Sequence, residues 1–491
     1  MIIWGVSAGH HDASISVLDD HKLVFAAHSE RYSKVKNDKT IHRNLLSEAL
    51  SISPERPRKI IWYEDPRKTT MRHLFSRNWS NVIRPSPRKL IGGDVPIVYS
   101  EHHLSHAAGG YYTSKFNEAA VLVIDAVGES ESSSIWYGCN NKLTKVKSWK
   151  YPNSIGLFYS AVTSLIGLKP NEEEYILMGM AAYGDPHRYM TVLETACTTN
   201  GKFTPYTLKD LHRGIFLNFE PNEQDTFDLA ASCQLIYEDL LRQMLAEVKD
   251  FMPFANNLVF SGGCALNCLG NRILYDFFDN VWIMPNPGDA GSSLGAALSY
   301  TKKRTDFTPY LGSCIQSDYQ FNSDKINAIV KYLVNPKHGV CGLVHGRAEF
   351  GPRALGNRSL IADPRDLNNK NLVNKIKNRQ KFRPLAPIIM EEHADSYFGL
   401  EGRTSPYMQY AVKCLKPDEI PAVTHIDGTS RVQTVNYNQN PFLYKLLKAW
   451  YVETGCPVLL NTSLNIKGMP LVNDRKDALN FEQTYKIRVF K

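Results

Sequence analysis

The sequence predicts an α/β protein with a duplicated first domain and a separate second α/β domain. Residues 2–27 and 119–149 each contain three short apolar or alternating segments joined by tight polar turns, and helical patterns follow each set. This repetition indicates two similar halves that face each other across a cleft. A polar, irregular stretch separates this domain, residues 1–305, from the second, residues 325–491. The 491 residues are too many for a single core.

The individual strands are expected where apolar and polar residues alternate or where apolar residues run together. In the first half they are Ile2–Ser7, Ala13–Leu18 and Lys22–Ala27, and in the second half they are Ala119–Asp125, Ser134–Gly138 and Leu143–Trp149. Helical patterns cover 41–50 and 228–250. Two more strands, 257–260 and 281–284, each run into a turn that contains glycine.

Charge and cysteine content narrow the class of protein. The formal net charge of +8 favours phosphorylated ligands or polyanions as partners. The nine cysteines are scattered, odd in number and without a framework spacing, which is typical of reduced thiols. No apolar run approaches the length of a membrane span, and Met1–Gly5 begins with a strand-like pattern in place of a signal peptide. We therefore expect a cytoplasmic protein that does not associate with membranes.

A pair of histidines is the first candidate metal site. His102 and His106 are four residues apart, so they share one face if the segment is helical. Asp125 ends a predicted strand, and Asp289 lies at a strand-to-helix turn. Two imidazoles with carboxylates suit Fe(II), Mn(II) or Zn(II). By spacing alone, a helix with two hydrogen-bonded histidines remains the alternative.

Two glycine turns are candidate nucleotide-binding loops. Ser261-Gly262-Gly263 follows an apolar strand and precedes a helix, and Gly288 to Gly291 repeats the pattern. Backbone N–H groups in such turns approach phosphates closely, and a helix N-terminus favours their charge. Asn267 belongs to the same segment as the first turn. His11-Asp12, in the first predicted β-turn, could place a base or a phosphate contact in the same cleft.

An arginine-rich segment is the strongest candidate for anion binding. Residues 346–359, GRAEFGPRALGNRS, hold Arg347, Arg353 and Arg358 between glycines and a proline. Guanidinium groups bind phosphate and carboxylate oxygens in a fork geometry. Lys381 and Arg383 add charge, and the run at 461–465 offers short polar side chains. A solvated surface loop is the alternative, although dense glycine and proline punctuation favours a binding loop.

Taken in order along the chain, these motifs resemble the NodU/CmcH family of O-carbamoyltransferases. The resemblance covers nearly the whole chain. Its segments are the His11-Asp12 turn, Ser29 to Arg31, Glu101 to His106, Ile124 to Glu129, Ser154 to Gly167, Tyr175 to Gly184, Ser261 to Asn267, Pro287 to Ala297, Gly346 to Arg365, Phe382 to Pro387, Asp427 to Val435, and Leu460 to Pro470. After Pro470 the chain stops at Lys491, whereas the family pattern usually runs into a longer tail.

The resemblance implies a fold and a mechanism. It implies a first domain like the Kae/TsaD members of the actin and sugar-kinase superfamily, followed by a YrdC-like domain. The second domain would form carbamoyl-adenylate from ATP, as its Mg complex, and carbamoyl phosphate. The first would then transfer the carbamoyl group to an acceptor hydroxyl. The family's iron ligands fall on His102, His106, Asp125 and Asp289.

The expected roles of the remaining residues follow from this mechanism. His11 is the candidate general base, with Asp12 beside it, and Arg347, Arg353 and Arg358 would neutralise phosphates during adenylation. The residues expected to bind nucleotide are Ser261, Gly262, Gly263, Asn267 and Gly288. Those expected to bind carbamoyl phosphate or the adenylate are Lys381, Arg383, Ser359, Asn461 and Asn465. Fe(II), or another divalent metal, is the expected cofactor.

The sequence leaves the acceptor open. Residues 66–93 carry seven Lys or Arg residues, no acidic residue, and the interleaved aromatic rings of His73, Phe75 and Trp79. Basic and aromatic side chains together can follow a phosphate backbone and stack on bases, which points to a hydroxymethylpyrimidine in DNA or its nucleotide. A sugar or antibiotic-type hydroxyl is the alternative. Two further alternatives are threonylcarbamoyl-adenylate chemistry on tRNA and a non-catalytic nucleotide-binding protein. The oligomeric state, a homodimer included, also stays open.

Overall fold

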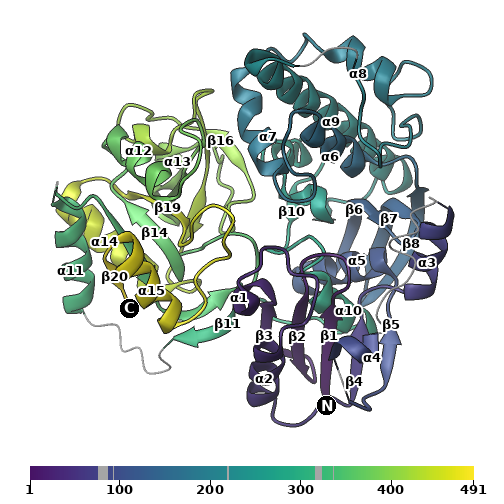
Figure 1. Ribbon diagram of the computed structural model, residues 1–491, viewed down its shortest axis with the longest axis horizontal. Coiled ribbons are helices and arrows are strands. Elements are labelled where there is room, and N and C mark those ends of the chain that lie inside the picture. The colour runs from purple at the N-terminus through teal and green to yellow at the C-terminus, as the bar shows by residue number, and fades with distance from the viewer. Residues whose placement is uncertain (76–86, 92, 218–220, 316–322, 336) are drawn as a thin grey trace. The chain divides into compact units, whose positions relative to one another are not determined.

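A computed structural model describes residues 1–75, 87–91, 93–217, 221–315, 323–335 and 337–491 (Figure 1). The chain forms two compact units. Unit 1 consists of residues Met1–Ser29 and Asn37–Phe307, and unit 2 of residues Glu30–Lys36 and Thr308–Lys491. Unit 2 therefore begins before residue 325, the boundary expected from the sequence. It also takes up a short helix, α1 (Glu30–Ser33), from early in the chain.

The first half of unit 1 is a five-stranded sheet. Its strands are β1 (Ile2–Ser7), β2 (Ser14–Asp19), β3 (Lys22–His28), β4 (Lys59–Trp62) and β5 (Ile97–Tyr99), in the spatial order β3-β2-β1-β4-β5. β1, β2 and β3 form an antiparallel meander, and β4 and β5 continue the sheet parallel to β1. Helices α2 (Arg43–Ile52), α3 (Pro66–Phe75) and α4 (Pro87–Ile91) lie between these strands in sequence.

The second half of unit 1 repeats this sheet. Its strands are β6 (Glu118–Gly128), β7 (Glu131–Cys139), β8 (Lys142–Lys150), β9 (Asn257–Ser261) and β10 (Asn280–Trp282), in the order β8-β7-β6-β9-β10. β6, β7 and β8 are again an antiparallel meander, and β9 and β10 are again parallel to the first strand. Strand order and strand directions agree between the halves, which confirms the predicted duplication within an α/β domain.

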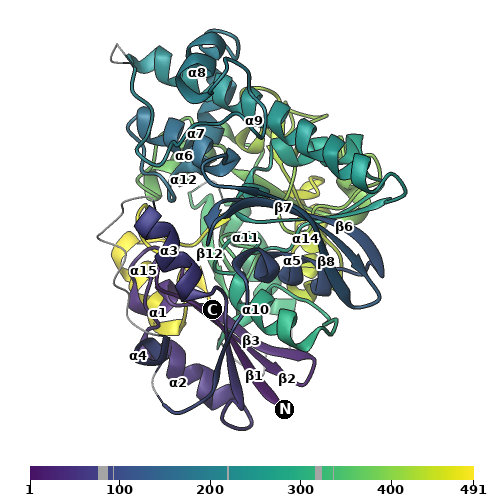
Figure 2. The ribbon, with the colours of Figure 1, turned by 90° about the vertical axis from the view of Figure 1, so that its right-hand side faces the viewer.

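Two helices connect the sheets. α5 (His102–Thr113) packs on β6 and β9, α10 (Ser292–Thr301) packs on β1, and the two helices pack on each other. Figure 2 shows them between the first meander and the second. Glycines permit the close crossing, because a Cβ added at Gly295 would lie 1.8 Å from the carbonyl oxygen of Ser105. The crossing brings the start of α5 next to the loop before α10.

The remaining helices of unit 1 follow β8 and precede β9. They are α6 (Ile155–Leu165), α7 (Glu174–Met180), α8 (Met190–Cys197) and α9 (Glu223–Phe251). α9 begins five residues earlier than predicted because of a capping box. The Asn222 side chain accepts from the Asp225 N–H, and the Asp225 carboxylate accepts from the Asn222 N–H. Polar residues in this first turn satisfy the helix end and do not contribute to the apolar pattern.

Unit 2 is built on a six-stranded mixed sheet with the order β18-β15-β19-β14-β12-β20. Its strands are β12 (Val340–Val344), β14 (Arg358–Ala362), β15 (Ala386–Met390), β18 (Gln433–Val435), β19 (Val458–Ser463) and β20 (Val489–Phe490). Two strand pairs, β11 (Tyr310–Ile315) with β13 (Gly346–Glu349) and β16 (Ala411–Lys413) with β17 (Thr429–Arg431), form small separate sheets.

Both faces of this sheet are buried. One apolar cluster includes residues of α11 (Ser323–Val334) and α14 (Pro441–Thr454), and the other includes residues of α12 (Leu367–Ile376), α13 (Ala394–Tyr397) and α15 (Arg475–Tyr485). β12, β14 and β15 are accordingly buried along their whole length. Across the described ranges of both units, we find no helix with the length and apolarity needed to span a membrane.

Candidate functional site

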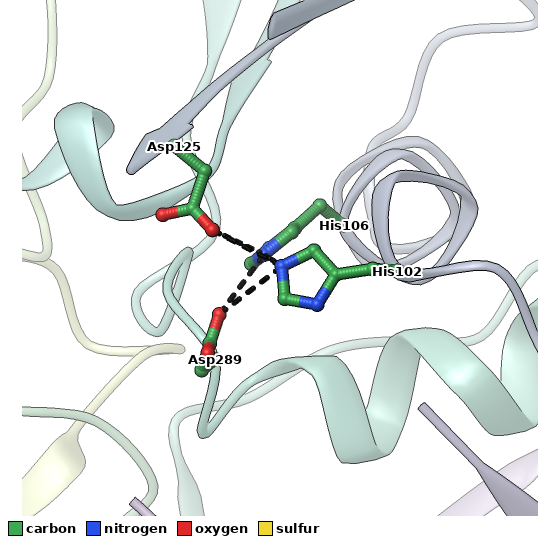
Figure 3. A group of neighbouring side chains, drawn as sticks. All are labelled: His102, His106, Asp125 and Asp289. Atoms are coloured by element: carbon green, nitrogen blue, oxygen red, sulfur yellow. Dashed lines mark hydrogen bonds and ion pairs between the residues drawn. The ribbon is translucent and has the colours of Figure 1, made fainter. Parts of the chain in front are cut away.

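Four predicted metal ligands converge in unit 1 (Figure 3). His102 and His106 lie one turn apart at the start of α5, Asp125 lies near the end of β6, and Asp289 lies in the loop before α10. One ligand atom from each falls within 4.8 Å of all the others. His102 Nε2 is 3.0 Å from Asp125 Oδ2, and His106 Nε2 is 3.2 Å from Asp289 Oδ1. Gly128 makes room, because a Cβ there would lie 1.9 Å from the His102 ring.

The hydrogen bonds of His106 indicate which of its atoms could bind a metal. His106 Nδ1 lies 3.0 Å from the Pro287 carbonyl oxygen, which can only accept, so Nδ1 carries a proton. In the neutral ring, Nε2 then has a free lone pair. This atom lies 3.0 Å from His102 Nε2, so a proton or a cation is needed between the two nitrogens. With two carboxylates beside them, the donor set fits a divalent cation such as Fe(II), Mn(II) or Zn(II).

The electrostatics of the cluster agree with a cation site. Burial by itself lowers the pKa of His106, but the hydrogen bonds to Asp125 and Asp289 outweigh it and raise the pKa to about 10. Burial raises the pKa of Asp289, yet the charge of His102 outweighs this effect and the pKa falls to about 2. Positive charge is thus favoured among these atoms. A divalent cation would supply that charge while the imidazoles stay neutral.

The predicted general base lies next to this cluster. His11 Nδ1 is 2.9 Å from Asp12 Oδ2, and His11 Nε2 is 3.6 Å from Asp289 Oδ2. Burial lowers the pKa of His11, but the hydrogen bond to Asp12 and the charge of Asp289 raise it to about 10 overall. A cation bound by Asp289 would offset part of this rise. The base function of His11 stays a prediction.

The two glycine turns meet beside the predicted metal ligands. Gly262 N–H donates to the Pro287 carbonyl oxygen, and Gly263 N–H donates to Asp125 Oδ1. Gly262 has a φ of +90°, and a Cβ there would lie 2.2 Å from the Ile124 carbonyl oxygen. Both the backbone conformation and the lack of space therefore require glycine. Ser261 is fully buried at the end of β9. Nucleotide binding by Ser261, Gly262, Gly263 and Gly288 stays a prediction.

Asn267 has a different environment from the one expected. Its amide group pairs with that of Gln234: Asn267 Nδ2 donates to Gln234 Oε1, and Gln234 Nε2 donates to Asn267 Oδ1. Asn267 Oδ1 also accepts the N–H of Gly270. These bonds give Asn267 a structural role in holding the turn against α9, in place of the nucleotide contact expected from the sequence.

In unit 2, the arginine-rich segment divides into buried and accessible arginines. Arg358 is fully buried, and its five N–H groups contact five main-chain carbonyl oxygens. The acceptors belong to Ser313, His345, Gly346, Asn357 and Asn473. No N–H is left for a phosphate. We therefore assign Arg358 a structural role and withdraw the catalytic role expected from the sequence. Arg347 and Arg353 are partly exposed and stay predicted phosphate ligands.

The backbone of this segment is held by a buried carboxylate. Glu349 Oε1 accepts the N–H groups of Leu355, Asn357 and Arg358. Ser359 and Asn461, both predicted substrate ligands, also form hydrogen bonds with the loop backbone. Ser359 Oγ accepts the Gly356 N–H, and Asn461 Nδ2 donates to the Ala354 carbonyl oxygen. Both side chains are buried, so they shape the loop and do not line an open surface.

A buried lysine accompanies the predicted carbamoyl-phosphate ligands. Lys377 Nζ lies 2.7 Å from Asn465 Oδ1 and 3.1 Å from Ser463 Oγ, and it also contacts the carbonyl oxygens of both residues. All these acceptors are neutral. Burial, and then the charges of Arg379 and Arg383, hold the pKa of Lys377 well below its usual value. An anion bound here would supply the missing countercharge. Lys381 is exposed and Arg383 is half-buried on the same segment.

His345, in the same unit, should make stability depend on pH. Burial, and then the charge of Arg358, lower the pKa of His345 to about 3. Below about pH 6.5 an unfolded histidine takes up a proton, whereas the folded one does not until pH 3, so the free energy of unfolding falls as pH falls, by up to about 1.4 kcal/mol per pH unit. Replacing His345 with Leu should flatten this dependence between pH 6 and 4 in denaturant titrations. An equal slope in both proteins would contradict the assignment.

The basic segment at 66–93 lies partly outside the described residues, which exclude 76–86 and 92. Three of its described cations form contacts within unit 1. Arg67 pairs with Asp65 at 2.9 Å, Lys68 pairs with Glu101 at 2.6 Å, and Arg72 donates to the Val127 carbonyl oxygen. Arg88 and Lys89 are exposed. These contacts reduce the charge that α3 could offer to a phosphate backbone.

Sequence reasoning missed Lys377 in unit 2 and the pair His10 and Glu64 in unit 1. Lys377 lies 86 and 88 residues before the side chains that it contacts. Glu64 comes two residues after β4 and lies 3.2 Å from His10 Nε2. Neither belongs to a recognisable spacing pattern. For Lys377, the only local signal is a run of basic residues, 375–383.

Comparison with known proteins places both units of the chain in one family. The family model described as Carbamoyltransferase N-terminus matches residues 92–298, and that described as Carbamoyltransferase C-terminus matches residues 332–490. Among solved structures, full-length HypF in its phosphate- and nucleotide-bound form aligns with 61% of this chain and 55% of its own, at 13% identity and a TM-score of 0.35.

Curated relatives match over most of their length. An uncharacterised protein of Synechocystis sp. is 33% identical, over 97% of this chain and 93% of that protein. Nodulation protein NolO of Bradyrhizobium diazoefficiens is 32% identical, over 77% and 75%. The 3'-hydroxymethylcephem-O-carbamoyltransferase of Amycolatopsis lactamdurans is 28% identical, over 98% and 96%. With both carbamoyltransferase regions matched and relatives of this identity and coverage, the chain belongs to the NodU/CmcH family of carbamoyltransferases.

Proposed function

We propose that this carbamoyltransferase is ATP-dependent and transfers its carbamoyl group to a hydroxyl by way of carbamoyl-adenylate. The observation that carries the proposal is the convergence of two imidazoles and two carboxylates within 4.8 Å in unit 1. Unit 2 holds a separate set of basic side chains. The two sets suit two different half-reactions, of which one handles phosphates and the other an alcohol.

The first half-reaction is assigned to unit 2. Carbamoyl phosphate and water yield carbamate and phosphate, and a carbamate oxygen then attacks the α-phosphorus of ATP while pyrophosphate leaves. Arg347, Arg353, Lys377 and Arg383 would neutralise the phosphate oxygens. The acceptors of Lys377 in Ser463 and Asn465 are neutral, so a nearby anion would stabilise its charge through space, without a new hydrogen bond. Glu349 contributes by holding the loop backbone in place.

The second half-reaction is assigned to unit 1. The acceptor hydroxyl attacks the carbonyl carbon of carbamoyl-adenylate, its proton passes to His11 Nε2, and AMP leaves. His102, His106, Asp125 and Asp289 would hold Fe(II) or another divalent metal, which orients the nucleotide and polarises oxygen when bound. Gly262 and Gly263, which carry no side chain, would let the adenylate approach the turn closely. Asp12 holds the His11 ring through Nδ1.

For the acceptor we propose a hydroxymethyl group on an unsaturated ring. A hydroxymethylpyrimidine in DNA, or its nucleotide, is the first candidate because of the basic segment 66–93. A small molecule is the second, because one relative of 28% identity is named for a hydroxymethylcephem substrate. The internal pairing of Arg67, Lys68 and Arg72 favours an acceptor smaller than duplex DNA.

Transfer of labelled carbamoyl tests these assignments directly. The protein would receive labelled carbamoyl phosphate, ATP, Mg and Fe(II), with hydroxymethylcytosine DNA, unmodified DNA and hydroxymethyldeoxycytidine monophosphate in parallel. We expect pyrophosphate release and label on a hydroxymethylated acceptor only. Lys377→Met should lose pyrophosphate release and transfer together while it keeps metal binding. Transfer that proceeds without ATP would refute the adenylate route. Pyrophosphate release without label on any of these acceptors would direct the search to small-molecule hydroxyls.

A further inference from the structure

The two ring nitrogens of His102 face different carboxylates. Nε2 points into the metal cluster, 3.0 Å from Asp125 Oδ2. Nδ1 points the other way and lies 4.0 Å from Oε2 of Glu64, a side chain just beyond β4 that is 3% exposed. Among the described residues, the buried Nδ1 atom has no hydrogen-bond partner. Of the carboxylates that the structure describes, Glu64 is therefore the nearest to His102 Nδ1, an atom whose protonation state matters for metal binding.

A metal at the cluster would require a proton on His102 Nδ1. An imidazole binds a metal through a lone pair, so Nε2 must be unprotonated and the neutral ring then carries its proton on Nδ1. His106 meets this requirement by donating Nδ1–H to the Pro287 carbonyl oxygen at 3.0 Å. In the described part of the chain, His102 Nδ1 has no such carbonyl acceptor. A buried N–H needs an acceptor, and Glu64 Oε2 lies in the right direction.

Glu64 is itself held in position from two sides. Its Oε1 lies 3.2 Å from His10 Nε2, and its Oε2 accepts the Thr69 hydroxyl at 3.1 Å. The charge of Glu64 also raises the pKa of Arg72 on α3, although burial lowers that pKa overall. Glu129, a second buried carboxylate, accepts the main-chain N–H groups of Asp65 and His102, and within the described ranges of the chain it forms no ion pair with the His102 ring.

We propose that Glu64 is a positioning residue for the metal site: it accepts Nδ1–H of His102 and so sets the tautomer and orientation of that ligand. The proposal rests on the metal site proposed above, not on the identity of the acceptor. A carboxylate behind a ligating histidine fixes the ring and strengthens its donor nitrogen. Through His10, Glu64 also ties the ligand to the turn that carries His11, whose Nε2 lies 3.6 Å from Asp289 Oδ2. The turn is thus anchored to the metal ligands at two points.

Metal affinity tests this role without using transferase activity. The full-length protein, freed of metal, would be titrated with Co(II) and followed by its visible absorption and by competition with a chelator. We expect Glu64→Gln to bind Co(II) about 10- to 100-fold more weakly than the wild type, with a shifted spectrum. Glu129→Gln is the matched control, since it also removes a buried charge near His102, and it should keep the wild-type affinity and spectrum. Glu64→Asp should recover part of the loss.

Two outcomes separate this proposal from the proposed function. If the wild type binds no Co(II), the metal site fails; if it binds Co(II) and Glu64→Gln binds it equally well, only the role of Glu64 fails. Should Glu64→Gln not fold, histidine-labelled wild-type protein loaded with Zn(II) gives a second measurement by NMR. A proton on Nδ1 of His102, assigned by its loss in His102→Gln, supports the proposal. A proton on Nε2 of that ring overturns it.

Discussion

Arg358→Leu should destabilise unit 2 by more than about 4 kcal/mol, enough to prevent its folding at 37 °C. The side chain is fully buried, and it satisfies five main-chain carbonyl oxygens from four separate parts of the chain. Leucine has a similar volume but no donors, so all five carbonyls would lose a partner away from water. Burial lowers the pKa of Arg358 to about 10, so the group stays charged at neutral pH.

Denaturant unfolding and limited proteolysis would measure this loss. Arg365→Leu is the control in the same unit. Its guanidinium pairs with Asp363 at 2.7 Å with 40% of the side chain exposed, and such pairs contribute about 0–1 kcal/mol. If Arg358→Leu kept wild-type stability and lost only the pyrophosphate release that depends on carbamoyl phosphate, this result would contradict the structural role. It would restore the phosphate-binding role that the sequence suggested.

His106→Ala should abolish tight binding of a divalent metal in unit 1. The substitution removes one of four ligands, so affinity should fall by more than the roughly 100-fold that marks the largest effects of outer-sphere partners. It also removes the bond from Nδ1 to the Pro287 carbonyl oxygen, which connects α5 to the second glycine turn. Carbamoyl transfer should be lost, whereas pyrophosphate release in unit 2 should persist.

Metal content after dialysis and Co(II) titration would measure this effect. His103→Gln is the matched control. His103 is buried on the same helix, but its Nδ1 lies 2.8 Å from Ser134 Oγ and its Nε2 lies 3.1 Å from the Glu131 carbonyl oxygen, away from the cluster. The control should lower stability and keep the metal. Equal metal loss in both variants would mean that α5 as a whole, and not the ligand, is responsible.

The pattern of the sequence was sufficient for the doubled sheet. Both meanders were predicted within a few residues, because short alternating strands with tight polar connections depend on local residue order. The contribution of residues 30–36 to unit 2 was not predictable in the same way. Arg31 donates to the Gly351 carbonyl oxygen and Tyr32 contacts Ser313, and these partners lie 320 and 281 residues away.

The candidate metal ligands could also be predicted from the sequence, for a local reason. A spacing of four places His102 and His106 on one helix face, and Asp125 and Asp289 each end a strand or precede a helix at an edge where such side chains gather. The family resemblance then selected these four among many acidic residues. The carboxylate behind His102 could not be selected, because Glu64 stands alone in the sequence and acquires its neighbours only through β4.

By itself, the sequence determined the doubled α/β fold and the carbamoyltransferase family, and it pointed to the four residues of the candidate metal site. Only the tertiary structure decided which basic side chains are buried and which are accessible. Arg358 and Arg353 look alike in GPRALGNR, yet one is fully buried on carbonyl oxygens and the other is partly exposed. Lys377 is one basic residue among several until β19 brings Ser463 and the adjacent Asn465 to its ammonium group. The reason is physical: burial and hydrogen-bond partners depend on chain segments far apart in sequence, which no local pattern records.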